Sequence, residues 1–193
     1  MRLVLIFVAA ALSSCVSTGA TISQAQESSA CAAAASYVEQ LLAKSSGRPI
    51  VFADVPDTLP RHPDPKALVK GWWTAPSGGS GVAPPSAMLS VLLREEASSA
   101  VKACVGIREL LQRRGIPYGG EAVRQAMELR EDGQFRATIL QVAHPVVSGD
   151  GKHALLASSV GAGPEAGVGS LEHLMLQPNG GWMHVGSLSL WIA

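Results

Sequence analysis

The side chains best suited to chemistry are histidines, and four of the five lie in the last third of the chain. A tight turn centred on Asn179-Gly180 would place His173 and His184 diagonally on one sheet face. Their Cα atoms would then be about 7–8 Å apart. Two imidazoles at that separation can share a carboxylate or a metal ion.

A metal centre at these histidines needs more ligands than the spacing supplies. Zinc takes three or four protein ligands, whereas this register places two of them together. His144 and His153 lie on neighbouring predicted strands. The face assigned to the pair also carries apolar residues, namely Leu171, Met175, Trp182 and Leu188. We therefore expect partly buried, hydrogen-bonded histidines, no metal and no cofactor. The alternative is a hydrolase or metal-dependent enzyme that uses His144, His173 and His184.

Two glycine-rich segments fall short of known signatures. Gly161–Ala166 fits G-x-G-x-x-A, but a strand pattern follows where a dinucleotide-binding fold needs a helix. Gly78–Val82 lacks the last glycine of the serine-hydrolase elbow.

The chain has equal numbers of basic and acidic residues: lysine plus arginine and aspartate plus glutamate number 15 each. This balance excludes the basic surface of a nucleic-acid-binding protein.

Cys31 and Cys104 each fall on the apolar face of a predicted helix. Two such thiols in an oxidising compartment predict a disulfide bond. The alternative is a pair of buried, unpaired cysteines that pack as small apolar side chains.

The first 25 residues have the pattern of a signal peptide. Arg2 supplies a positive start, and an apolar stretch of about ten residues follows, which is too short to span a bilayer. Leu12-Ser13-Ser14-Cys15 resembles the bacterial lipobox, which implies a lipid anchor on Cys15. The alternative is that Cys15 is removed with the leader. Either process predicts an exported protein, periplasmic or lipid-anchored to a bacterial membrane, with secretion as a further option.

Periodicity predicts a single α+β domain over residues 26–193. Helical spacing covers residues 29–45 and 87–114, with a break or kink at Ser98-Ser99. Period-two patterns and turn residues predict strands at 134–147, 153–161, 170–177 and 182–192. Residues 49–55 have the composition of an edge strand. We expect an antiparallel β-meander of about four strands, covered by the two helices.

A Pro/Gly-rich segment at residues 56–86 is predicted to be irregular, and it contains Trp72 and Trp73. An exposed tryptophan beside a loop can anchor a binding partner. In the alternative, both rings fill the core. The sequence thus favours a non-catalytic binding or interaction module, whose partner is an unknown protein or small ligand. Contact with a membrane is expected only through a lipid on Cys15.

The last 45 or so residues resemble the C-terminal hairpins of uncharacterised bacterial exported proteins and lipoproteins. The residues that carry this resemblance are Gly151–Leu155, Gly161–Gly169, Leu174, Asn179–Trp182 and Leu190–Ile192. The resemblance implies a pattern of turns around a buried tryptophan and no particular activity. The order of helix and curved sheet is also loosely similar to cystatin-like and NTF2-like domains.

Overall fold

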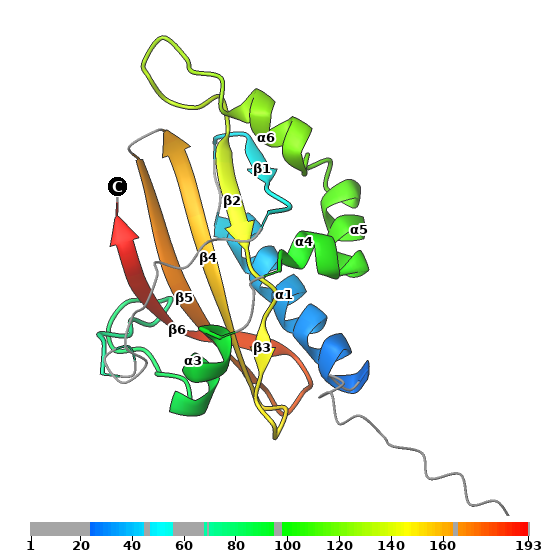
Figure 1. The fold of residues 1–193 in the computed structure, drawn as a ribbon, viewed down its shortest axis with the longest axis vertical. Coiled ribbons are helices and arrows are strands. Elements are labelled where there is room, and N and C mark those ends of the chain that lie inside the picture. The colour runs from blue at the N-terminus through cyan, green and yellow to red at the C-terminus, as the bar shows by residue number, and fades with distance from the viewer. Residues whose placement is uncertain are drawn as a thin grey trace, which may run out of the picture.

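The computed structural model describes residues 24–44, 47–55, 68, 70–94, 98–163 and 166–192, and Figure 1 shows their arrangement. The helices are α1 (Gln24–Lys44), α3 (Ser86–Leu92), α4 (Ala100–Ala103), α5 (Val105–Arg113) and α6 (Gly120–Ala126). The strands are β1 (Ile50–Phe52), β2 (Thr138–Val142), β3 (Val146–Val147), β4 (His153–Gly163), β5 (Ala166–Leu176) and β6 (Trp182–Ile192). The fold class is α+β, as predicted.

The sheet is mixed, so the prediction of a purely antiparallel meander is wrong. Its strands follow the order β1-β2-β4-β5-β6, and β3 pairs with β4 beyond the end of β2. β1 and β2 run parallel, with Val51 opposite Ile139, while the other pairs are antiparallel. Parallel neighbours need a crossover connection, and here the chain from Phe52 to Thr138, which includes α3 to α6, provides it.

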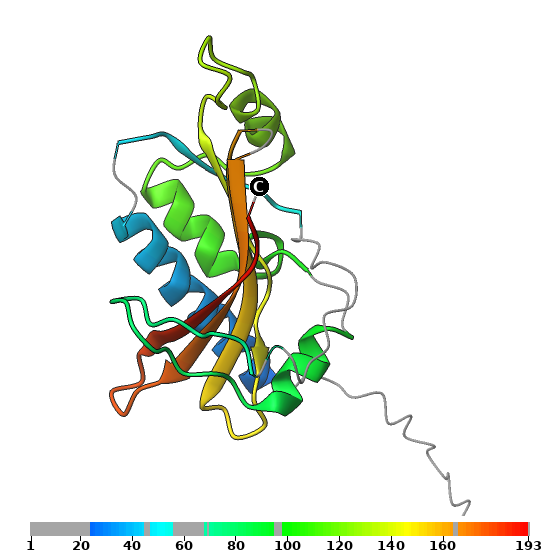
Figure 2. The same ribbon diagram turned by 90° about the vertical axis from the view of Figure 1, so that its left-hand side faces the viewer.

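Helices cover both faces of the sheet rather than one (Figure 2). On one face, which we call the α1 face, α1 and α5 pack on the sheet through buried side chains such as Val38, Ile107 and Leu111. On the opposite face, which we call the α3 face, α3 packs through Met88, Leu89 and Leu92. Strands β4 and β5 are therefore covered on both sides, which explains their nearly continuous apolar runs.

The predicted helix over residues 87–114 is divided into α3, α4 and α5. Ser99 is extended, accepts the first hydrogen bonds of α4 through its carbonyl oxygen, and forms a bridge with Ala143 beside the sheet. Cys104 is extended as well and separates α4 from α5. The expected break at Ser98-Ser99 is thus confirmed, and a second break occurs at Cys104.

The turn between β5 and β6 differs from the predicted two-residue turn at Asn179-Gly180. Gly180 donates a backbone hydrogen bond to Gln177, so the central residues of the turn are Pro178 and Asn179. Proline favours the first central position of such a turn, and Gly180, with φ of 82°, closes a three-residue loop. The pairing shifts by one position, so that Leu174 rather than Met175 lies opposite His184.

This shift places His173 and His184 on opposite faces, so the prediction of a shared face is wrong. His184 contacts Tyr37 on the α1 face, and His173 contacts Val82 on the α3 face. The register returns to the expected one at His173–Gly186, because a β-bulge inserts an additional residue of β6 between His184 and Gly186.

Candidate functional site

Cys31 and Cys104 form a disulfide bond, as predicted, with their Cα atoms 5.4 Å apart. The bond ties α1 to the junction between α4 and α5. Cys104 is buried, with 1% of its surface exposed, and Cys31 is half-buried. Cys31 is therefore the more exposed residue of the two.

A histidine and a carboxylate lie beside the disulfide. Nε2 of His144 is 3.9 Å from Sγ of Cys31 and 3.3 Å from Oε1 of Glu27. The backbone N–H of His144 donates to Ser98, which fixes the segment between β2 and β3. Glu27 lies in the first turn of α1. Because α1 begins at Gln24, five residues before the predicted start, the sequence analysis missed this carboxylate.

A pocket of about 200 Å³ opens next to this pair. Its walls come from the start of α1, from α3 and from the segment that leads into β3. The lining residues are Gln26, Glu27, Ala30, Val91, His144, Pro145, Val146 and Val147. The lining combines two ionisable side chains with apolar ones.

The same cluster is the group of described residues that could hold a metal ion. The donor atoms of Cys31, Cys104 and His144 all lie within 4.8 Å of one another. In the oxidised protein the two sulfurs are bonded to each other, and a metal ion needs them as thiolates. Metal binding here would therefore require reduction of the disulfide.

Trp72 and Trp73 have opposite environments. Trp72 is 81% exposed, whereas Trp73 is 4% exposed and donates from Nε1 to the carbonyl oxygen of Leu68. Their segment belongs to a short ribbon, residues 72–82, that turns at Gly78 and Gly79, both with positive φ. Thr74 and Ser80 pair across this ribbon. In that register Trp72 falls opposite Val82, which is 48% exposed.

The ribbon is hydrogen-bonded to the outer edge of β6. Thr74 and Ser187 exchange two backbone hydrogen bonds of 2.8 Å, and Val82 donates to Val185. A Cβ on Gly186 would lie 2.3 Å from the carbonyl oxygen of Val82, so only glycine fits at this contact. Part of the segment predicted as irregular is therefore a defined extension of the sheet.

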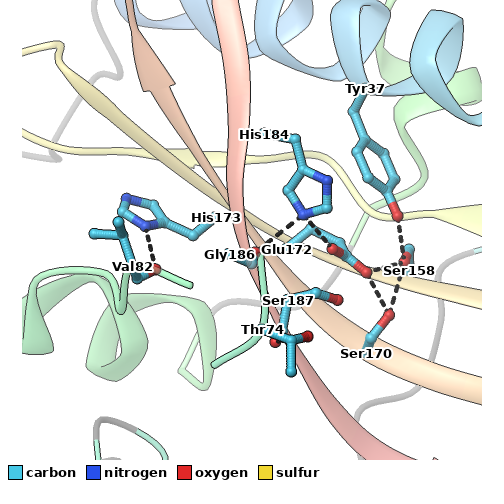
Figure 3. A network of polar contacts seen from close by, with 10 residues as sticks. All are labelled: Tyr37, Thr74, Val82, Ser158, Ser170, Glu172, His173, His184, Gly186 and Ser187. Atoms are coloured by element: carbon cyan, nitrogen blue, oxygen red, sulfur yellow. Dashed lines mark hydrogen bonds and ion pairs between the residues drawn. The ribbon is translucent and has the colours of Figure 1, made fainter. Parts of the chain in front are cut away.

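The α1 face contains a buried polar network around Glu172 (Figure 3). Ser158 and Ser170 donate to its Oε1. Oε2 lies 2.7 Å from Nε2 of His184, whose N–H is directed at the carbonyl oxygen of Gly186. With Ser158 committed to the carboxylate, the hydroxyl of Tyr37 is left to donate to Ser158.

Two pKa shifts follow from this arrangement. Burial would raise the pKa of Glu172, but the close contact and charge of His184 and the hydrogen bonds from Ser170 and Ser187 outweigh it, so the pKa is lowered. Burial, followed by the charge of Glu172, raises the pKa of Tyr37 well above its ordinary value. Glu172 is thus ionised at neutral pH while Tyr37 keeps its proton.

This network lacks the order of a catalytic triad. In such a triad the histidine stands between the serine and the carboxylate and takes the serine proton. Here both Ser158 and Ser170 donate directly to Glu172, and His184 contacts the far oxygen. The arrangement holds a charge in the core and does not activate a nucleophile.

His173 pairs with His153 rather than with His184. Nδ1 of His173 lies 2.9 Å from the carbonyl oxygen of Val82 and must donate to it, so Nε2 accepts from Nδ1 of His153 at 3.1 Å. Burial lowers the pKa of His173, against the hydrogen bond to Val82, and the charges of His153 and His184 lower it further. The neutral ring links the ribbon to the sheet.

The predicted site residues thus fall into separate places. His144 lies beside the disulfide, His173 under the ribbon and His184 on the opposite face of the sheet. Cys15 and residues 1–23 of the expected leader, together with residues 56–67 of the irregular segment, lie outside the described residues. Glu172 was missed because a single acidic residue in a strand pattern gives no signal of its partners.

Within the described part of the chain, no helix has both the length and the apolar character needed to cross a membrane. Comparisons with family models, with curated proteins and with solved structures find no match to this chain.

Proposed function

We propose that this chain is an exported binding module that engages a partner protein through Trp72 and Val82. The observation that carries this proposal is the 81% exposure of Trp72 on a backbone held at several points. A tryptophan ring carries a large apolar area, and aromatic residues of this kind dominate the energetics of protein interfaces.

The ribbon supports the proposal because it presents Trp72 in a defined position. Its neighbour Trp73 is buried and hydrogen-bonded, and Thr74 is paired with Ser187. An anchor on a fixed backbone loses little conformational entropy on binding. Trp72 and Val82 are apolar and the net charge of the chain is zero, which favours an apolar protein surface over a polyanion as partner.

Export is part of the same proposal. The disulfide agrees with an oxidising compartment. The leader over residues 1–25, the lipid anchor on Cys15 and a periplasmic location remain proposals from the sequence, as does the likeness to cystatin-like and NTF2-like domains. Intact-mass measurement of the native protein tests leader removal. Fatty-acid labelling of wild type against Cys15→Ala tests the anchor, and equal labelling of both would exclude it.

The enzyme alternative has less support than the binding module. It requires His144, His173 and His184 to converge, and they contact three different parts of the fold. The geometry therefore gives a hydrolase or a metal enzyme no common centre at these residues.

Crosslinking in the native host tests the binding surface. A benzophenone amino acid replaces Trp72 in one strain and Glu109, an exposed residue of α5, in a control strain. We expect a discrete crosslinked product from position 72 that is absent from position 109, and its loss when Val82→Asp is added. Equal products from both positions, or none from position 72, would contradict the proposal.

A further inference from the structure

We propose that the Cys31–Cys104 disulfide, with His144 and Glu27, is a site of thiol–disulfide exchange with cysteine thiols of a partner protein. This activity is independent of the binding surface at Trp72. It rests on three observations made together: the half-buried residue Cys31, a histidine that contacts both its sulfur and a carboxylate, and a pocket beside the histidine and the carboxylate.

Cys31 is the sulfur that an incoming thiolate can attack. Cys104 is 1% exposed and lies at the junction of α4 and α5, whereas Cys31 is a half-buried residue of α1. The pocket lies on the side of α1 that carries Glu27 and Ala30, within one turn of Cys31. It has room for a side chain next to the reacting cysteine of the partner.

His144 lies where it can donate a proton to the sulfur that leaves during the exchange. Its Nε2 contacts both Sγ of Cys31 and the carboxylate of Glu27. The contact with Glu27 holds the imidazole of His144 beside the sulfur, and an imidazole N–H next to sulfur stabilises a thiolate by hydrogen bonding. Glu27 thus acts on the sulfur through His144, as a positioning residue.

The exchange balances as follows. A partner thiolate attacks Sγ of Cys31, the bond between Cys31 and Cys104 breaks, and its electron pair leaves on Sγ of Cys104. That thiolate takes the proton from Nε2 of His144, whose distance to it is within 4.8 Å. A second partner thiolate attacks the partner sulfur of the mixed disulfide and releases the Cys31 thiolate. The two partner thiols release their protons to water and lose two electrons as they form a disulfide. This protein gains the two electrons, and water returns one proton to His144 and supplies one to the Cys31 thiolate.

The first test is the rate at which the disulfide of the folded, full chain is reduced at pH 7. Dithiothreitol serves as the probe, and a chelator is present so that metal ions do not compete for the thiolates. We expect His144→Gln to slow the reaction about tenfold and Glu27→Gln to slow it several-fold. Glu109→Gln, on the exposed side of α5, should leave the rate unchanged.

Two further measurements separate exchange from a purely structural role. The urea midpoint of each oxidised variant must equal that of wild type, which is the expected result for Glu27→Gln because its side chain is 46% exposed. In a thiol redox buffer, His144→Gln should shift the equilibrium about tenfold towards the disulfide, which is about 30 mV. A wild-type rate that merely follows global unfolding, or rates unchanged in both variants, would overturn the proposal.

A trapping experiment tests the partner class. Cys104→Ala leaves Cys31 free, and a cysteine-containing peptide disulfide is offered as the probe. We expect a mixed disulfide on Cys31 that forms about tenfold more slowly when His144→Gln is added. Equal rates in both backgrounds would overturn the role of His144.

Discussion

The Glu27–His144 pair and the Glu172–His184 pair have the same two side chains in different surroundings. In the first, the side chains are 46% and 15% exposed and Nε2 lies 3.3 Å from the carboxylate. In the second, they are 4% and 7% exposed and the distance is 2.7 Å. The buried pair is surrounded by donors from Ser158 and Ser170, whereas the open pair faces a pocket and a disulfide.

The comparison indicates that burial determines which role a histidine–carboxylate pair has in this protein. A buried ion pair makes the stability of the fold sensitive to the loss of either partner, because the charge that remains is neither paired nor solvated by water. A partly exposed pair contributes less to stability, because water still solvates a charge that loses its partner. The predictions below test this division, from the largest effect to the smallest.

Removal of the buried carboxylate should give the largest effect. Glu172→Ala leaves His184 in the core without its ion-pair partner and two serines without their acceptor. We expect the free energy of unfolding to fall by about 3–5 kcal/mol, as measured by urea denaturation. A fall below about 1 kcal/mol would mean that the buried network is not coupled to folding.

Loss of the disulfide should cost somewhat less. The bond closes a segment with a sequence separation of 73 residues, and bonds of this kind typically contribute about 2–4 kcal/mol. We expect that decrease in the double variant Cys31→Ala, Cys104→Ala, relative to the oxidised wild type. An unchanged urea midpoint would show that the disulfide does not stabilise the folded protein.

The pH dependence of stability should report the buried pair. The folded pKa of Glu172 is lowered, so its stabilisation is fully present above the ordinary pKa of about 4.3 and is lost as pH falls through the folded value. Urea titrations between pH 7 and pH 3 should therefore show a decline below about pH 4.3. Glu172→Gln should have a shallower decline, and an identical slope would contradict this assignment.

The smallest effect is expected for the open pair. Glu27→Ala should change the free energy of unfolding by less than about 1 kcal/mol, because its partner keeps contact with water. The same urea experiment measures it, and the Glu172→Ala variant is the matched comparison. A loss as large as that of Glu172→Ala would remove the distinction between the two pairs.

The sequence predicted the disulfide, α1 and the strands β4 to β6, because helical spacing and period-two alternation are local signals. It did not predict the parallel pairing of β1 with β2, since the partner residues are almost 90 positions apart and no local pattern marks them. The predicted assignment of His173 and His184 to one face of the β5–β6 hairpin is wrong for two reasons. Pro178 moves the turn by one residue, and the bulge after His184 moves the register back. A one-residue slip exchanges the two faces of a strand.

The candidate sites were predictable only in part for a related reason. Cys31 and Cys104 are identified by residue type and by their place on the apolar faces of two predicted helices, and Trp72 by the Gly/Ser-rich segment beside it. Glu27 and Glu172 acquire their roles from partners that are 117 and 12 residues away in the chain, at His144 and His184. Such pairings depend on the tertiary fold, which a single sequence does not display.

The ribbon over residues 72–82 has a further consequence for β6, an eleven-residue strand at the border of the sheet. The free backbone groups of a border strand can recruit a strand from another molecule and start aggregation. Thr74 and Val82 already occupy those groups at Ser187 and Val185. Gly186 allows this cover to lie close, so a side chain at that position would expose the edge as well as disturb the contact. Residues 72–82 of the same chain therefore cover this part of the β6 edge and oppose pairing with a strand of another molecule.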